Sequence, residues 1–294
     1  MNEIKKIASP IAGCMRWGKW GANFDTYSYR QIIDACLQND IVSFDHADIY
    51  GDYTTEKEFG NALKENASIR NKIKIITKSG IQLLSENRLQ HSIKSYNTSA
   101  KHIITSVEQS LKNFSTDYLD IFLIHRPDIL LHPAEIAEAI NLLKQQGKII
   151  QFGVSNFATH QIDMLNKFIS IEYNQTEISI IHLQPFSNGT LDKCLQHNII
   201  PMAWAALGGG LFVDDSHPRF RSIYNVAHEL AEKYVTGINQ ILIAFLLLHP
   251  SQIVAIVGTT KIERLLQAKE ASTIHLQRED WYKLWVASTG EDVE

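Results

Sequence analysis

The chain has 294 residues, and its 28 basic and 32 acidic side chains give a net charge of −4 at pH 7. This near balance offers no electrostatic reason to expect nucleic acid or an acidic membrane surface as a partner. Its three cysteines are odd in number, widely spaced and without CxxC or Cys/His pairing, which indicates neither a disulfide framework nor a zinc site. Reduced thiols in the cytosol fit this cysteine pattern.

No targeting or membrane segment is predicted. The first twelve residues lack an apolar stretch long enough for a signal peptide, and the longest apolar run, residues 241–248, is far short of the roughly 20 residues of a membrane helix. We therefore expect an unprocessed, soluble, cytoplasmic protein with no membrane partner. Nothing in the sequence predicts the oligomeric state.

Runs rich in Ile, Leu and Val alternate with longer amphipathic segments along the whole chain. The predicted strands cover residues 11–13, 41–44, 73–77, 119–124, 149–154, 171–174, 200–203 and 253–257. The predicted helices cover residues 28–39, 55–66, 99–113, 134–146, 159–168, 190–197, 222–248 with a break near Gly237, and 261–271. A terminal helix with Trp281 and Trp285 on its buried face follows.

Eight strands alternating with helices predict a parallel sheet closed into a (β/α)₈ TIM barrel. Without a Pro/Gly/Ser-rich linker, residues 1–294 are expected to form one barrel domain. The rival is a doubly wound open sheet. Against it, no GxGxxG opens the first helix, and chemically interesting residues follow many different strands instead of one switch point.

The segment 44–51 follows the second predicted strand and carries Asp45 and Tyr50. A tyrosine has an unperturbed pKa of about 10, so it gives up a proton near neutral pH only if a cation stabilises its phenolate. Lys78 ends the next strand-like run, and His125 ends the one after that. In a barrel, the carboxyl ends of all strands meet at one mouth, so these side chains should lie together.

This combination resembles the aldo-keto reductases, whose catalytic tetrad follows three successive barrel strands. The resemblance maps the tetrad onto Asp45, Tyr50, Lys78 and His125. Residues 125–128 also resemble the LIHRPD stretch of a bacterial oxidoreductase branch. A carbonyl that receives hydride becomes an alkoxide, so the chemistry requires an acid beside its oxygen. Tyr50 would be the acid, Lys78 would favour its phenolate, Asp45 would hold the lysine, and His125 would orient the carbonyl.

Four further segments resemble the cofactor site of that family. Residues 153–157 match its GVSNF motif and residues 174–175 its NQ pair, which implies that Ser155, Asn156 and Gln175 bind the nicotinamide carboxamide. Asn156 could alternatively cap the following helix. In segment 203–212, Trp204 would stack on the nicotinamide, and a pyrophosphate loop would follow. The residues of that loop are Leu207, Gly208, Gly209 and Gly210.

The last segment leads from the final strand into a helix. Its predicted binding residues are Gly258, Thr259, Thr260, Lys261 and Arg264. Backbone donors, hydroxyls and two cations at a helix start suit an anion, and the family uses this place for the adenosine 2′-phosphate. We therefore predict NADPH rather than NADH. A capped helix with solvated charges is the plainer alternative.

Six side chains are predicted to wall the mouth, and their character favours an apolar aldehyde or ketone as substrate. These are Trp17, Trp20, His46, Ile49, Phe186 and Phe212. Two other functions remain open. A metal-dependent barrel hydrolase could use Asp45, His46, Asp48 and His125, although an HxH pair is absent after the first strand and we predict no metal. A non-catalytic NADPH-binding or sensing module could use the same fold.

Overall fold

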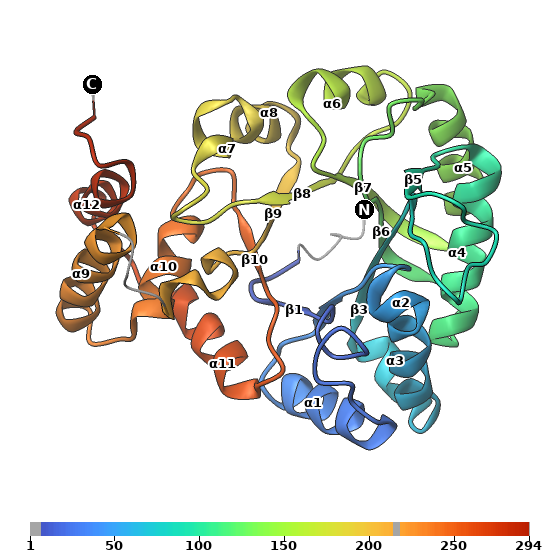
Figure 1. Ribbon diagram of the computed structural model, residues 1–294, viewed down its shortest axis with the longest axis horizontal. Helices are drawn as coiled ribbons and strands as arrows, with labels where there is room; N and C mark the ends of the chain where they lie inside the picture. The colour runs from blue at the N-terminus through green and yellow to red at the C-terminus, as the bar shows by residue number, and fades with distance from the viewer. Residues whose placement is uncertain (1–6, 214–217, 294) are drawn as a thin grey trace. The chain divides into compact units, whose positions relative to one another are not determined.

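Eight parallel strands form a closed barrel in the computed structural model, which describes residues 7–213 and 218–293 (Figure 1). Around the barrel, the strands follow the order β1-β10-β9-β8-β7-β6-β3-β2. Their bounds are β1 Ile11–Gly13, β2 Ser43–Asp45, β3 Lys74–Ser79, β6 Leu119–Ile124, β7 Ile149–Ser155, β8 Tyr173–Glu177, β9 Ile200–Trp204 and β10 Val254–Val257. The predicted (β/α)₈ TIM barrel is confirmed.

Strand β6 shows why these runs become buried strands. Five of its six residues are apolar and fully buried, as expected for a parallel strand that is covered on both faces. The exception is Asp120, whose carboxylate accepts hydrogen bonds from Arg70 at 2.8 Å and from the Ile75 N–H at 2.9 Å. Both bonds satisfy a polar group that would otherwise destabilise the strand.

Helices alternate with these strands, as predicted. Their bounds are α1 Thr26–Gln38, α3 Thr55–Lys64, α4 Ala100–Phe114, α5 Pro133–Gln145, α6 Thr159–Asn166, α8 Thr190–His197, α9 Pro218–Lys233, α10 Ile238–Leu247, α11 Ile262–Glu270 and α12 Arg278–Thr289. Side-chain caps set two of the starts: Asp25 accepts from the Ser28 N–H before α1, and Ser99 accepts from the His102 N–H before α4.

The chain divides into two compact units, one of which contains Ala12–Gln175 and Gly258–Ile262. The other contains the rest of the described chain. Within the first unit, the strand register places Asp45 beside Ile76 and Lys78 beside Leu123. The carboxyl ends of β2, β3 and β6 therefore lie together. The assignment of residues 1–294 to one barrel domain stays a prediction.

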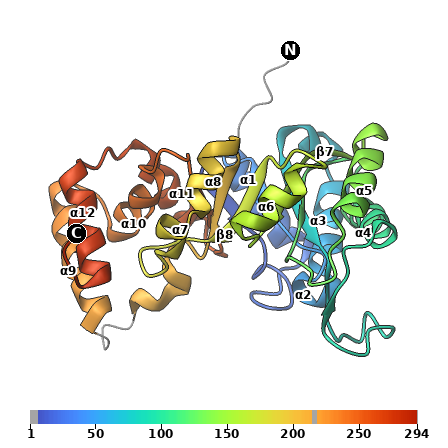
Figure 2. The same cartoon turned by 90° about the horizontal axis from the view of Figure 1, so that it is seen from above.

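Two short elements of the first unit were not predicted. Helix α2, Tyr50–Tyr53, directly follows the loop after β2. An antiparallel hairpin of β4, Ile81–Gln82, and β5, Ser95–Tyr96, follows β3, and the loop between its strands extends beyond α2 in Figure 2. Strands of two residues leave almost no period-two pattern, which is why the sequence did not reveal them.

The long helix predicted over residues 222–248 is two helices, α9 and α10, which meet at an angle of 93°. Gly237 lies between them in an extended conformation, so the predicted break is confirmed. Across residues 7–213 and 218–293, no single helix has the length and hydropathy needed to span a membrane. The bent pair meets that criterion only when its two helices are taken together.

In the second unit, an aromatic cluster joins α12 to α10. Trp281 stacks on Phe245 with ring centroids 4.7 Å apart and donates its indole N–H to the Phe245 carbonyl at 2.9 Å. Trp285 stacks on Trp281 from the next turn. The terminal helix packs through these two tryptophans, as predicted, although both are half-buried and not fully buried. Phe186 of α7, Gln184–Ser187, contacts all three rings and is part of this cluster.

Candidate active site

The four side chains predicted to form the tetrad meet in the first unit. Asp45 ends β2, Lys78 is the penultimate residue of β3, His125 follows β6, and Tyr50 begins α2. The Lys78 ammonium bonds to two other members of the group. Its Nζ atom donates to Asp45 Oδ2 at 2.9 Å, to Tyr50 Oη at 3.0 Å and to the His46 carbonyl at 2.5 Å.

Burial makes these contacts strong. The exposed fraction is 0% for Lys78, 3% for Asp45, 6% for His125 and 9% for Tyr50. Burial alone would lower the pKa of Lys78, but Asp45 and Tyr50 outweigh it and raise that pKa above its usual value. Lys78 is therefore an ammonium at neutral pH, and a buried ion pair of this kind interacts with little screening by solvent.

Two opposing effects act on Tyr50. Burial raises the pKa of its hydroxyl, Lys78 lowers it, and the net result is a pKa above 10. The predicted direction of the lysine effect is correct, but desolvation exceeds it. Tyr50 consequently carries its proton at neutral pH, which is the form that a proton donor requires.

His125 faces the tyrosine, with ring centroids 6.1 Å apart and an interplanar angle of 79°. Burial lowers the pKa of this imidazole well below 6.5, and the charges of Lys78 and Arg126 act in the same direction. His125 is therefore neutral at pH 7. Its Nδ1 atom is buried without a hydrogen-bond partner in the described part of the chain.

Gln175 connects the tetrad to the predicted nicotinamide residues. Its Nε2 atom donates to Asp45 Oδ1 at 2.8 Å, so both carboxylate oxygens of Asp45 are bonded. Ser155 lies beside Gln175 in the register of β7 and β8, and its hydroxyl accepts from Asn156 Nδ2 at 2.8 Å. The structure therefore brings Ser155, Asn156 and Gln175 together. The N-cap position of α6 is Ala158, so the alternative role of Asn156 as the N-cap residue is wrong.

Arg126, which the sequence places at the rim of the barrel in a structural role, also belongs to this edge of the unit. Its Nη1 atom donates to the Ser155 hydroxyl at 3.2 Å and to the His125 carbonyl at 2.9 Å. The side chain is half-buried. Its place directly after His125 was the available signal, because a residue that follows the end of a barrel strand lies near the mouth.

The glycine turn predicted to hold pyrophosphate lies in the second unit, after Trp204 at the end of β9. Leu207 precedes it, and Gly208, Gly209 and Gly210 have φ values of 63°, 67° and 90°. Only glycine adopts this succession readily. A Cβ at Gly209 or Gly210 would meet nothing within 4 Å, so the space beside both residues is open. The Gly208 and Gly210 N–H groups themselves donate within the turn.

The segment after β10 is anchored from the core of the first unit. Trp17 donates its indole N–H to the Thr259 carbonyl at 2.7 Å, and Thr259 Oγ1 accepts from the Lys261 N–H at 3.1 Å. Thr260 is half-buried, while Gly258 and Lys261 are exposed. This donor set of the first unit, with open backbone, hydroxyls and a cation, fits an anion. In the second unit, Arg264 is exposed on α11.

Three of the predicted wall residues lie elsewhere. Phe186 packs in the aromatic cluster of α7, α10 and α12. Trp17 is fully buried among aromatic rings that include Phe59. His46 is fully buried between Phe59 and Phe114, at centroid distances of 4.5 and 5.1 Å. Because successive strand residues point to opposite faces, His46 turns toward the helices while Asp45 turns inward. This placement also removes His46 from the ligand set that a metal hydrolase would need.

Of the other predicted wall residues, Trp20 is 41% exposed with its ring 6.2 Å from that of Tyr50. Ile49 is buried against Tyr50. The side chain of Phe212 lies outside the described residues. The wall beside Tyr50 therefore depends on Trp20.

Comparisons with known proteins agree with this geometry. The model of the aldo/keto reductase family matches residues 11–285. The uncharacterised oxidoreductase YcsN of Bacillus subtilis (strain 168) is 40% identical over 296 residues, which cover 100% of this chain and 98% of that protein. A 6-dehydroglucose reductase of Agrobacterium fabrum (strain C58) is 35% identical over 263 residues, which cover 89% of this chain and 88% of that protein.

Among solved structures, the thermostable aldo-keto reductase Tm1743, in complex with the inhibitor epalrestat, has the same fold. It aligns with a TM-score of 0.80 and 24% identity, over 97% of each chain. The family model covers almost the whole chain, and the YcsN relative matches it from end to end. The chain therefore belongs to the aldo/keto reductase family.

Proposed function

We propose that this oxidoreductase uses NADPH to reduce an aldehyde or ketone to the alcohol, with Tyr50 as the proton donor. The observation that carries the proposal is the position of Lys78 Nζ, 2.9 Å from the Asp45 carboxylate and 3.0 Å from the Tyr50 hydroxyl. A buried, protonated hydroxyl beside a fixed cation is what the reduction of a carbonyl requires.

Each member of the tetrad has a separate task in this proposal. Tyr50 gives its proton to the carbonyl oxygen as negative charge develops there, and Lys78 stabilises the resulting phenolate. His125, neutral because burial lowers its pKa, binds the carbonyl oxygen through an imidazole nitrogen. Asp45 holds the lysine and is itself held by Gln175.

NADPH would supply the hydride. Ser155, Asn156 and Gln175 would bind its carboxamide, and Trp204 would stack on the nicotinamide ring. Leu207 and the open glycine turn 208–210 would hold the pyrophosphate. The 2′-phosphate would be bound by Gly258, Thr259, Thr260, Lys261 and Arg264, and the exposed cations in that group support NADPH over NADH.

The substrate is proposed to be a small carbonyl compound that is reduced in the cytoplasm. The apolar preference rests on Trp20, since Trp17 and His46 are core residues. The Agrobacterium relative is named for a sugar aldehyde, and the guanidinium of Arg126 beside His125 can donate to hydroxyl groups. Polar sugar aldehydes therefore belong in the substrate panel with apolar aldehydes and diketones.

The test is NADPH consumption by the native chain and by Tyr50→Phe across that panel. We expect turnover that falls by roughly 10²- to 10⁴-fold in the variant, while NADPH binding persists. Tyr27→Phe is the matched control, because Tyr27 is 68% exposed and should leave turnover unchanged. Equal turnover in Tyr50→Phe would refute the mechanism. No turnover with tight NADPH binding would favour a non-catalytic binding module.

A further inference from the structure

The backbone that follows Tyr50 has an uncommon conformation. Gly51, Asp52 and Tyr53 have positive φ values of 58°, 62° and 67° in succession. Glycine adopts this region readily, but the Cβ atoms of Asp52 and Tyr53 make it unfavourable for those residues. Such a turn persists only where surrounding contacts hold it.

Those contacts come from the loop 83–94, which joins the strands of the β4–β5 hairpin. Asn87 Nδ2 donates to the Asp52 carbonyl at 2.8 Å, and the Arg88 guanidinium lies 4.4 Å from the centroid of the Tyr53 ring. The Tyr53 hydroxyl in turn accepts from the Leu83 N–H at 2.8 Å. One loop therefore contacts both non-glycine residues of the turn.

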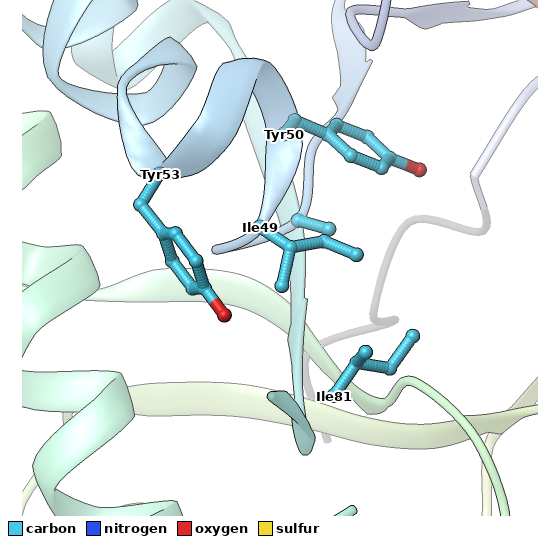
Figure 3. Close-up of a cluster of buried hydrophobic side chains, with 5 residues drawn as sticks. Ile49, Tyr50, Tyr53 and Ile81 are labelled. Carbon is cyan, nitrogen blue, oxygen red and sulfur yellow. The ribbon is translucent and has the colours of Figure 1, made fainter. Parts of the chain in front are cut away.

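The same turn is continuous with the proposed proton donor. Tyr50, Tyr53, Ile49 and Ile81 belong to one buried cluster, in which the two tyrosines project to either side of Ile49 (Figure 3). Ile81 begins the hairpin three residues after Lys78, so the hairpin extends from the strand that carries the lysine. The loop is thus linked to both partners of the 3.0 Å contact between Lys78 Nζ and Tyr50 Oη.

We propose that Asn87 and Arg88 are positioning residues, which hold the turn Gly51–Tyr53 so that the Tyr50 hydroxyl stays within hydrogen-bond distance of Lys78. This inference rests on the proposed function only in naming Tyr50 as the proton donor. The hairpin then supports the proposed active site, and Leu83 of its loop packs against the cluster that contains Tyr50. Displacement of a reacting group by about 1 Å can reduce a rate roughly 10²-fold.

The loop itself offers a matched control. Leu89 is adjacent to Arg88 but 86% exposed. Leu89→Ala therefore changes the loop without removing a contact to the turn. Asp52→Gly offers a rescue, because glycine adopts the left-handed conformation without the contacts that Asp52 needs. It also removes the exposed ion pair between Lys19 and Asp52, which contributes little.

The experiment compares the native chain with Asn87→Ala/Arg88→Ala, the same pair combined with Asp52→Gly, and Leu89→Ala. We expect the double variant to lose about 10- to 100-fold in kcat, with the KM for NADPH changed by less than about twofold. Asp52→Gly should restore most of the loss, and Leu89→Ala should show none. Circular dichroism establishes that each variant is folded.

A second readout does not require turnover. The ultraviolet titration of Tyr50, obtained by subtracting the curve of a matched Tyr50→Phe chain, reports the environment of its hydroxyl. We expect the titration to shift in Asn87→Ala/Arg88→Ala and to return with Asp52→Gly. An unshifted Tyr50 titration in the folded double variant would overturn the inference, whatever its activity. Loss of turnover in Tyr50→Phe would then still support the proposed function.

Discussion

Replacing Lys78 by methionine should destabilise the fold as well as abolish turnover. Methionine preserves most of the length of the side chain but leaves the Asp45 carboxylate, 3% exposed, without its counter-charge. At 2.9 Å and an effective dielectric constant of about 20, the pair attracts by roughly 6 kcal/mol. Loss of one partner of a buried ion pair costs about 3–5 kcal/mol, and this is the expected decrease in the free energy of unfolding.

The companion variant is Asp45→Asn/Lys78→Met, in which both charges are removed. Gln175 can still bond the side-chain oxygen of the new asparagine, so the double variant buries no uncompensated charge. We expect it to be only about 1–2 kcal/mol less stable than the native chain, because replacing both partners of a buried pair is far less costly than removing one. The double variant should therefore be more stable than Lys78→Met, even though it carries one more substitution.

Urea unfolding of the native chain, the two single variants and the double variant provides the measurement. The four free energies form a double-mutant cycle whose interaction energy should be several kcal/mol. If the destabilisation of the double variant equalled the sum of the two single effects, Asp45 and Lys78 would not interact in the folded state. The electrostatic account of the tetrad would then be refuted.

Three further changes test other parts of the structure. Burial raises the pKa of Asp48 well above 3.8, and its Oδ1 atom is buried without a partner among the described residues. Asp48→Asn should therefore stabilise the fold by about 1–3 kcal/mol at pH 8 and by much less at about pH 3, below the unfolded pKa, where the carboxyl is mostly protonated in both states. Urea unfolding at the two pH values checks this. Lys261→Met and Arg264→Met should each raise the KM for NADPH about 10-fold and leave that for NADH unchanged, as steady-state kinetics would show. Trp17→Phe should lower the free energy of unfolding by about 1 kcal/mol or more through its lost bond to the Thr259 carbonyl, measured by urea unfolding.

The barrel and the tetrad were predictable because both depend on local signals. Each predicted strand is an apolar run, and buried parallel strands require such runs. Asp45, Lys78 and His125 each stand where a run ends, and the closure of the barrel brings those ends together. Nothing in this inference required the details of side-chain packing.

Two kinds of feature were not predicted from the sequence: the direction in which a side chain points, and contacts between residues that are far apart in the chain. The sequence could have placed His46 by strand alternation, since it follows the inward Asp45 and must turn toward the helices. By contrast, Trp17 is held through Thr259, 242 positions away, and no local pattern encodes such a contact. The hairpin strands are also too short to show a period-two pattern of apolar residues in the sequence. The loop between them nevertheless contacts the turn after Tyr50.

The balance of forces on Tyr50 bears on the direction of catalysis. Burial outweighs Lys78 and keeps the pKa of the hydroxyl above 10, so nearly every molecule carries the proton that reduction consumes at neutral pH. Alcohol oxidation would need the opposite form, a phenolate that accepts a proton, and this form is scarce until the pH approaches that pKa. Because Lys78 stays charged over the same pH range, it stabilises the Tyr50 phenolate equally in carbonyl reduction and in alcohol oxidation. It therefore does not change which of the two reactions the protonation state of Tyr50 favours. Under the proposed mechanism, alcohol oxidation should therefore accelerate as the pH rises toward the pKa of Tyr50.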